Sequence, residues 1–104
     1  MYGVGVIGCG GMGTAHAGHF AALPDVEVVA CADAVAEAAQ RLAVRHNARA
    51  YTDAQQLLED PRVNVVVICT PTQLHAGFAV LRKFRPVTGN RRIKIDTAAI
   101  SQYQ

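Results

Sequence analysis

Gly8-Cys9-Gly10-Gly11-Met12-Gly13, which directly follows the apolar run Tyr2-Gly3-Val4-Gly5-Val6-Ile7, is the stretch of sequence that decides the fold. The apolar run is typical of a strand in a parallel sheet covered on both faces, and the G-x-G-x-x-G pattern predicts a tight turn into a helix. In such a turn Gly8 permits the sharp change of direction, Gly10 leaves room for a pyrophosphate, and Gly13 lets the helix pack against the strand. The N–H groups of the helix's first turn lack helical partners, so we expect them to attract a phosphate.

An acidic residue follows at the distance that a dinucleotide site requires. Val26–Ala32 reads as the second strand, and Asp33 stands at its carboxyl end, twenty positions after Gly13. A carboxylate there accepts hydrogen bonds from the adenosine ribose and repels a 2′-phosphate, and neither Ala34 nor Val35 supplies a neutralising arginine. The sequence therefore predicts NAD as cofactor, with NADP disfavoured. Asp33 as the N-cap of the next helix is an alternative, compatible role, and a glycine-rich turn that binds nothing is the other alternative.

Helical and strand patterns alternate along the rest of the chain. The expected helices run from Gly11 to about Leu23, from Ala34 to His46, from Asp53 to Glu59, and from residue 72 or 73 to about Lys83. The further expected strands are Arg49–Thr52 and Val63–Cys69. This order requires parallel strands and right-handed crossovers. We therefore expect an α/β fold, a Rossmann-type doubly wound parallel sheet that is incomplete, with about four strands and a poorly defined C-terminal tail.

Composition narrows the class of protein. The chain has 104 residues, of which 51% are hydrophobic and 17% charged, as expected for one compact domain. Without a basic leader or a long apolar run, neither a signal peptide nor a membrane anchor is expected. Cys9, Cys31 and Cys69 show no disulfide or zinc spacing, so we expect a cytoplasmic protein without a metal site. Cys9 reads either as a small residue tolerated beside a ligand or as a reactive thiol at a helix N-terminus.

Charge divides the chain in two. Residues 1–81 carry four basic and seven acidic side chains, whereas residues 82–104 carry six basic and one acidic. We expect residues 1–81 to form the dinucleotide-binding domain and residues 82–104 to be a basic tail rather than a separate domain. The tail lacks stacking aromatic residues and a recognised motif, so no nucleic-acid partner is expected.

The segment Val65–Ala76, which reads V-V-V-I-C-T-P-T-Q-L-H-A, carries a family resemblance. With the glycine loop, His16-Ala17 and Tyr51–Leu58, it resembles the N-terminal domain of the glucose–fructose oxidoreductase/inositol dehydrogenase (Gfo/Idh/MocA) family over about residues 2–81. In that family the Thr-Pro segment and the following His border the cofactor. The resemblance therefore implies that Thr70, Pro71, Thr72 and His75 are cofactor neighbours; a solvent-facing role is the alternative for His75. The full expected cofactor set is Gly8, Cys9, Gly10, Gly11, Met12, Gly13, Asp33, Thr70, Pro71, Thr72 and His75.

The resemblance ends where the family's catalytic parts begin. Members continue into a fifth strand ending in Glu-Lys-Pro, with a catalytic lysine, and then into a substrate domain. This chain has no such motif, so Lys83 receives no catalytic role and no catalytic residue is expected. We interpret residues 82–104 as the product of a truncated or frameshifted gene.

The sequence therefore predicts the NAD-binding half of a sugar or polyol dehydrogenase, inactive on its own. The alternatives are a stand-alone NAD-binding regulatory module and a non-functional fragment. Because no convincing fifth strand follows, we expect the outer edge of Val63–Cys69 to be free and to favour self-association.

Overall fold

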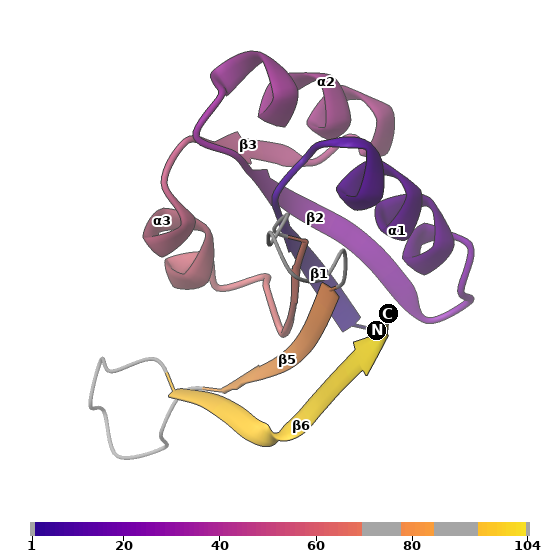
Figure 1. Cartoon of the computed structure of the whole chain (residues 1–104), viewed down its shortest axis with the longest axis vertical. Coiled ribbons are helices and arrows are strands. Elements are labelled where there is room, and N and C mark those ends of the chain that lie inside the picture. Colours follow the sequence, from indigo (N-terminus) through magenta and orange to yellow (C-terminus); the bar gives the residue numbers. More distant parts are fainter. Residues whose placement is uncertain (1, 70–77, 85–93, 104) are drawn as a thin grey trace.

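The computed structural model describes residues 2–69, 78–84 and 94–103, which form one six-stranded sheet with helices on both faces (Figure 1). The elements are β1 (Tyr2–Ile7), α1 (Gly11–Ala21), β2 (Val26–Ala32), α2 (Ala36–His46), β3 (Arg49–Tyr51), α3 (Ala54–Glu59), β4 (Val65–Ile68), β5 (Phe78–Phe84) and β6 (Lys94–Tyr103). The strand order is β3-β2-β1-β4-β5-β6, and the first four strands pair in parallel. The Rossmann-type parallel sheet expected from the sequence is confirmed.

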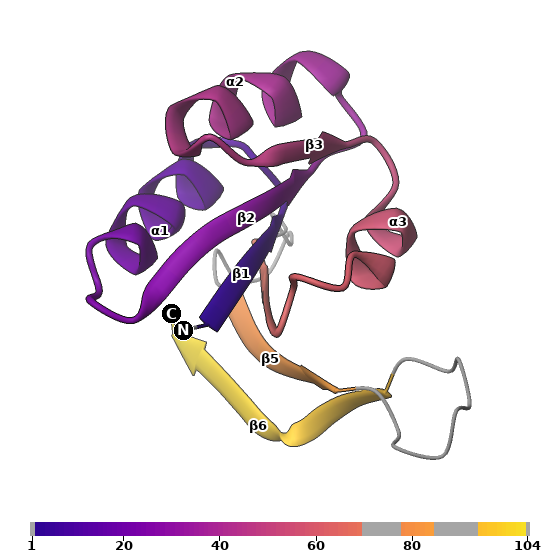
Figure 2. The ribbon, with the colours of Figure 1, turned by 180° about the vertical axis from the view of Figure 1, so that it is seen from behind.

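Two apolar layers hold the sheet to its helices. Figures 1 and 2 show α1 and α2 on one face of the sheet and α3 on the other. The buried residues between the sheet and α1 and α2 are Val4, Val6, Cys9, Ala17, Val28, Cys31, Ala39, Leu42, Ala43, Val67 and Cys69. The buried residues on the α3 side are Val29, Ala30, Ala32, Leu57, Val63 and Val66. Both faces of β1, β2 and β4 are therefore buried, which explains why these strands read as continuous apolar runs.

Strand β2 contains an irregularity that changes which face its residues occupy. Val4 of β1 lies opposite Val28, whereas the next residue, Gly5, lies opposite Ala30. The extra residue, Val29, is a β-bulge, so Val29 and Ala30 both belong to the α3 layer. Cys31 is thereby returned to the face covered by α1 and α2.

The ends of α2 and α3 are set by the residues that cap them. Helix α2 ends at His46, as the sequence predicted, and its C-cap Asn47 has a left-handed φ of 52° and ψ of 42°. At α3 the Asp53 side chain caps the helix by accepting a hydrogen bond of 2.9 Å from the Gln55 N–H. The alternative role of Asp33 as the N-cap of α2 is wrong, because this helix begins later and its N-cap is Val35.

The C-terminal part of the sheet differs from the expectation. A helix was expected from residue 72 or 73 to about Lys83, but Phe78–Phe84 form strand β5, antiparallel to β4; the earlier residues of that segment lie outside the described ranges. Residues 94–103 form β6, antiparallel to β5, instead of a poorly defined tail. The physical reason is that β4 would otherwise leave its backbone groups unpaired at an edge.

The expected free edge of the fourth strand is therefore wrong, because β5 pairs along β4 from Val65 to Ile68. The expected self-association depended on free backbone N–H and C=O groups at that edge, and β5 now pairs with them. The division of the chain at residue 81 stays a prediction. Within the described ranges, no helix has the length and apolar character needed to cross a bilayer.

Candidate functional site

The glycine loop joins β1 to α1 at the carboxyl edge of the sheet. Gly8 has a φ of 94°, a conformation that favours glycine, and a Cβ there would overlap the carbonyl oxygen of Cys69. A Cβ on Gly13 would overlap the carbonyl oxygen of Gly8, so both positions require the close approach of backbones. A Cβ on Gly10, in contrast, would meet nothing within 4 Å. Gly10 thus leaves an open space beside the loop, on the side where a ligand can approach.

The first turn of α1 is suited to an anion. Its N-cap is Gly10, which has no side chain to cap the helix, and the turn contains no acidic residue. The N–H groups of such a turn have no helical acceptors and carry the positive end of the helix dipole. The loop therefore combines exposed donors with open space, which are the two requirements for holding a pyrophosphate.

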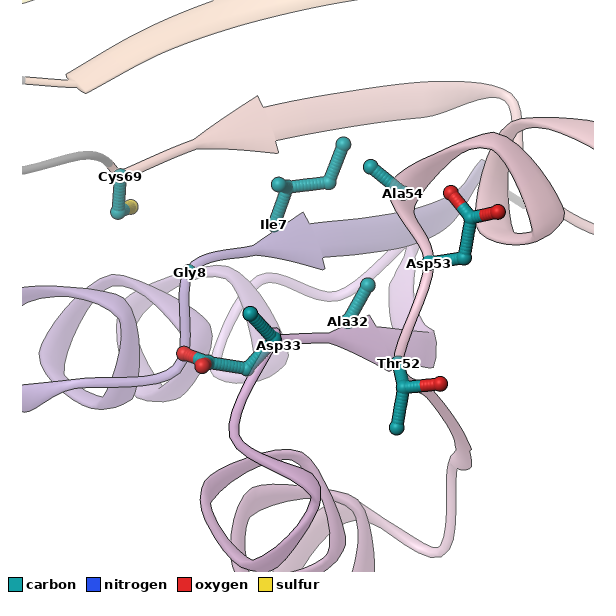
Figure 3. A pocket seen from close by; sticks show the side chains of 9 residues that line it. Ile7, Gly8, Ala32, Asp33, Thr52, Asp53, Ala54 and Cys69 are labelled. Carbon is teal, nitrogen blue, oxygen red and sulfur yellow. The ribbon is translucent and has the colours of Figure 1, made fainter.

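Asp33 lies beside this loop at the end of β2, where Figure 3 shows its carboxylate near Gly8. One carboxylate oxygen accepts a hydrogen bond of 2.8 Å from the Cys9 N–H, and the other accepts one of 2.8 Å from the Val35 N–H. The Asp33 N–H donates to the Tyr51 carbonyl oxygen at 3.1 Å, which ties the residue to β3. Asp33 is thus held rigidly against the loop, with further lone pairs on both oxygens for a ligand's hydroxyl groups.

A pocket of about 400 Å³ opens next to Asp33 (Figure 3). Its lining residues are Ile7, Gly8, Ala32, Asp33, Ala34, Thr52, Asp53, Ala54 and Cys69. The size is within the range of small-ligand sites. Of these residues, the sequence predicted only Gly8 and Asp33 as ligand neighbours. Thr52, Asp53 and Ala54 directly follow β3, so the rule that ligands bind beyond the carboxyl ends of parallel strands would have found them.

The structure places part of the predicted site. The glycine loop and Asp33 lie together at one edge of the sheet, and Cys69 joins them through a hydrogen bond of 2.8 Å from its N–H to the Ile7 carbonyl oxygen. The predicted cofactor neighbours that follow Cys69 lie outside the described residues: Thr70, Pro71, Thr72 and His75.

Comparison with known proteins shows the family to which this chain belongs. Residues 2–84 match the GFO_IDH_MocA model, described as an oxidoreductase family with an NAD-binding Rossmann fold. An inositol 2-dehydrogenase from Rubrobacter xylanophilus is 39% identical over 88 residues, which cover 81% of this chain and 25% of that protein. The chain spans about a quarter of the length of the curated relatives it matches.

Solved structures show the same likeness. The myo-inositol dehydrogenase from Lactobacillus casei, in complex with NAD(H) and myo-inositol, has a TM-score of 0.59 and 40% identity, covering 64% of this chain and 20% of that one. GenD2 from gentamicin A biosynthesis, in complex with NAD, has a TM-score of 0.66 and 36% identity, covering 71% of this chain and 21% of that one.

Proposed function

The chain belongs to the Gfo/Idh/MocA oxidoreductase family as an NAD-binding Rossmann domain, and from that premise we propose how its own residues bind the cofactor. The pyrophosphate lies over Gly10, against the first turn of α1, and the adenosine ribose lies against Asp33. The observation that carries this proposal is the open space at Gly10 directly before an uncapped helix. Phosphate needs both the backbone donors and the absence of a side chain there.

The preference for NAD over NADP rests on charge. A 2′-phosphate on the ribose would face the Asp33 carboxylate, and the residues that follow it, Ala34 and Val35, are exposed and uncharged. None of the described residues that line the pocket is basic, so none of them would neutralise the phosphate. The pocket beyond Asp33, with Thr52, Asp53 and Ala54 on its far wall, is in position for the adenine.

We infer that the whole protein transfers hydride between a polyol or sugar and NAD. Inositol dehydrogenases among the relatives support this substrate class. NAD supplies the hydride acceptor when bound, and this chain's residues hold and orient it. We assign the protein to the cytoplasm, because its three cysteines are free and buried, as in a reducing compartment.

The test is a calorimetric titration of NAD into the reduced chain and into Gly10→Val. The valine side chain has room in the free protein but occupies the place of the pyrophosphate, so binding should be lost while the circular dichroism spectrum is unchanged. Gly18→Val is the matched control: Gly18 is an open glycine of α1 outside the loop, and this variant should bind as the unmodified chain does. Unchanged affinity of folded Gly10→Val would show that the glycine loop is not the site.

A further inference from the structure

Three buried thiols gather beneath the glycine loop. Cys9 lies in the loop, Cys31 on β2, and Cys69 directly after β4, and all three are free. They belong to the same apolar cluster between the sheet and the helices α1 and α2. Cys31 has no exposed surface, whereas Cys9 is 5% exposed. The group is not a metal site, since the described residues contain no set of three or more ligands placed to hold an ion.

The β2 bulge brings Cys31 to Cys9. Strict alternation along β2 from Val28 would place Cys31 on the α3 side of the sheet. Because Val29 and Ala30 both take the α3 side, Cys31 lies instead on the side of Cys9. The pairing of these two thiols therefore depends on one extra residue in the strand.

The Cys9 thiol lies against the strand residue that directly follows Cys31. The Cys9 Sγ donates to the Ala32 carbonyl oxygen at 3.3 Å, and both thiols belong to the same buried cluster. Interaction with the Cys31 thiol lowers the pKa of Cys9, although burial and the Asp33 charge raise it, and the same interaction together with burial raises the pKa of Cys31. Burial raises the pKa of Cys69 to about 11. Cys9 is thus the thiol that ionises first, with Cys31 as its neighbour.

We propose that Cys9 and Cys31 form a reversible disulfide on exposure to a peroxide, and that this disulfide weakens NAD binding at the loop. The second half of the proposal rests on the proposed function.

The chemistry needs only the peroxide as oxidant. The Cys9 thiolate attacks one peroxide oxygen, the O–O bond breaks, and the leaving hydroxide takes a proton to become water, which leaves Cys9 as a sulfenic acid. The Cys31 sulfur then attacks the Cys9 sulfur, the S–O bond breaks, and the departing hydroxide takes the Cys31 proton as a second water. The two thiols lose two electrons and the peroxide gains them. A reducing dithiol reverses the change by thiol–disulfide exchange.

The disulfide would act on the cofactor through the loop. A disulfide holds its sulfurs about 2.05 Å apart, much closer than two thiols that are not covalently joined, so its formation pulls Cys9 toward β2. The Cys9 N–H is bonded to Asp33, and the next residue is Gly10, so the movement distorts both proposed contacts with NAD. Bound NAD, lying over the loop, would in turn shield Cys9 from peroxide.

The test treats the reduced full chain with hydrogen peroxide, with and without NAD, blocks the remaining thiols, and maps peptides by mass spectrometry. Cleavage before Asp25 and Asp33 places Cys9 and Cys31 on separate peptides, because the cut at Asp25 falls between them. We expect these peptides to be linked, the link to form more slowly with NAD, and dithiothreitol to release it. Calorimetry should show about tenfold weaker NAD binding by the disulfide form, with recovery after reduction.

Variants separate this pair from the third thiol. Cys31→Ala should abolish the linked peptide, and Cys69→Ala, the matched control, should retain it. A link between Cys9 and Cys69, or linkage only after denaturation, would overturn the disulfide, and equal NAD affinity of the oxidised and reduced forms would overturn its regulatory effect. Failure of the reduced chain to bind NAD would overturn the proposed function and the regulatory effect together, while the linked peptide reports on the disulfide independently.

Discussion

The Asp33 carboxylate accepts a hydrogen bond of 2.8 Å from the backbone N–H of Cys9, so the acidic residue at the end of β2 and the glycine loop at the end of β1 form one unit. Asp33 therefore helps to fix the position of the glycine loop as well as facing any ligand bound beside it. Asp33 therefore has two roles, its charge toward the ligand and its hydrogen bond to the loop, and different substitutions can remove one role or both.

Asp33→Asn removes the charge but keeps a side-chain oxygen that can accept from the Cys9 N–H. We expect it to bind NAD within about tenfold of the unmodified chain and to bind NADP more tightly than that chain does, because the repulsion of a 2′-phosphate is gone. Asp33→Ala also loses the tie to the loop and should weaken both cofactors. Parallel NAD and NADP titrations check this, with Asp25→Asn, an exposed carboxylate before β2, as the control. Equal NAD and NADP affinities in the unmodified chain would contradict the assignment.

Gly8→Ala should destabilise the fold. A side chain at a φ of 94° is strained, and its Cβ would overlap the Cys69 carbonyl oxygen, so we expect a loss of about 2–4 kcal/mol in the free energy of unfolding. Gly18→Ala is the control, because its Cβ meets nothing within 4 Å in the interior of α1 and should stabilise by about 0.5–1 kcal/mol. Urea unfolding of both variants measures the difference; equal stabilities would show that the Gly8 turn relaxes freely.

The sequence predicted β1, β2 and β4 well because their apolar runs are long and have glycine or proline signals beside them. Strand β3 is only Arg49–Tyr51 and was predicted from its place between two helical patterns. It could not predict the bulge at Val29, because valine, alanine and cysteine are all compatible with either face of a buried strand. Residues 78–84 were misassigned because the spacing of Phe78 and Leu81 fits a helix, whereas the contacts that make them a strand are pairings with β4 and β6, which lie outside the segment itself. Long-range pairing leaves no local signature.

The candidate site, like the fold, could be predicted from the sequence only in part. The spacing between Gly13 and Asp33 predicted that an acidic residue would lie at the crevice, and in the structure Asp33 lies beside the loop. That its carboxylate bonds to the Cys9 N–H depends on the exact approach of two strand ends, which the spacing does not determine. The far wall of the pocket, Thr52 to Ala54, could have been inferred from the end of β3.

Asp60 should make the free energy of unfolding depend on pH in the acid range. Burial alone would raise its pKa, but hydrogen bonds from the Arg62 side chain and N–H and from the Tyr51 hydroxyl outweigh burial and lower the pKa from 3.8 to about 2. Because the pKa is lowered in the folded state, the stabilisation is complete above the unfolded pKa and is lost as the pH falls from about 4 toward 2. After allowance for solvent screening, we expect a loss of about 1–2 kcal/mol, measured by urea unfolding across this range.

Asp60→Asn should flatten that pH profile, and a profile that keeps its full slope in this variant would assign the effect to other carboxylates. Tyr51→Phe removes the hydrogen bond of 2.8 Å to Asp60 and should cost about 1 kcal/mol at neutral pH. Tyr2→Phe is the matched control, because Tyr2 is 56% exposed, and this change should be neutral.

The pairing of β4 with β5 can be tested by amide exchange. Strand β4 lies between β1 and β5, so every N–H from Val65 to Ile68 faces a neighbouring strand and should exchange slowly. Val80→Pro removes a backbone donor opposite Val67 and should make alternate β4 amides exchange quickly, whereas Val80→Ala should not. With the β4 edge covered, light scattering should show no concentration-dependent association through it in the unmodified chain, and Val80→Pro should begin to associate. Rapid exchange at alternate β4 amides in the unmodified chain, together with association, would instead show that this edge is free.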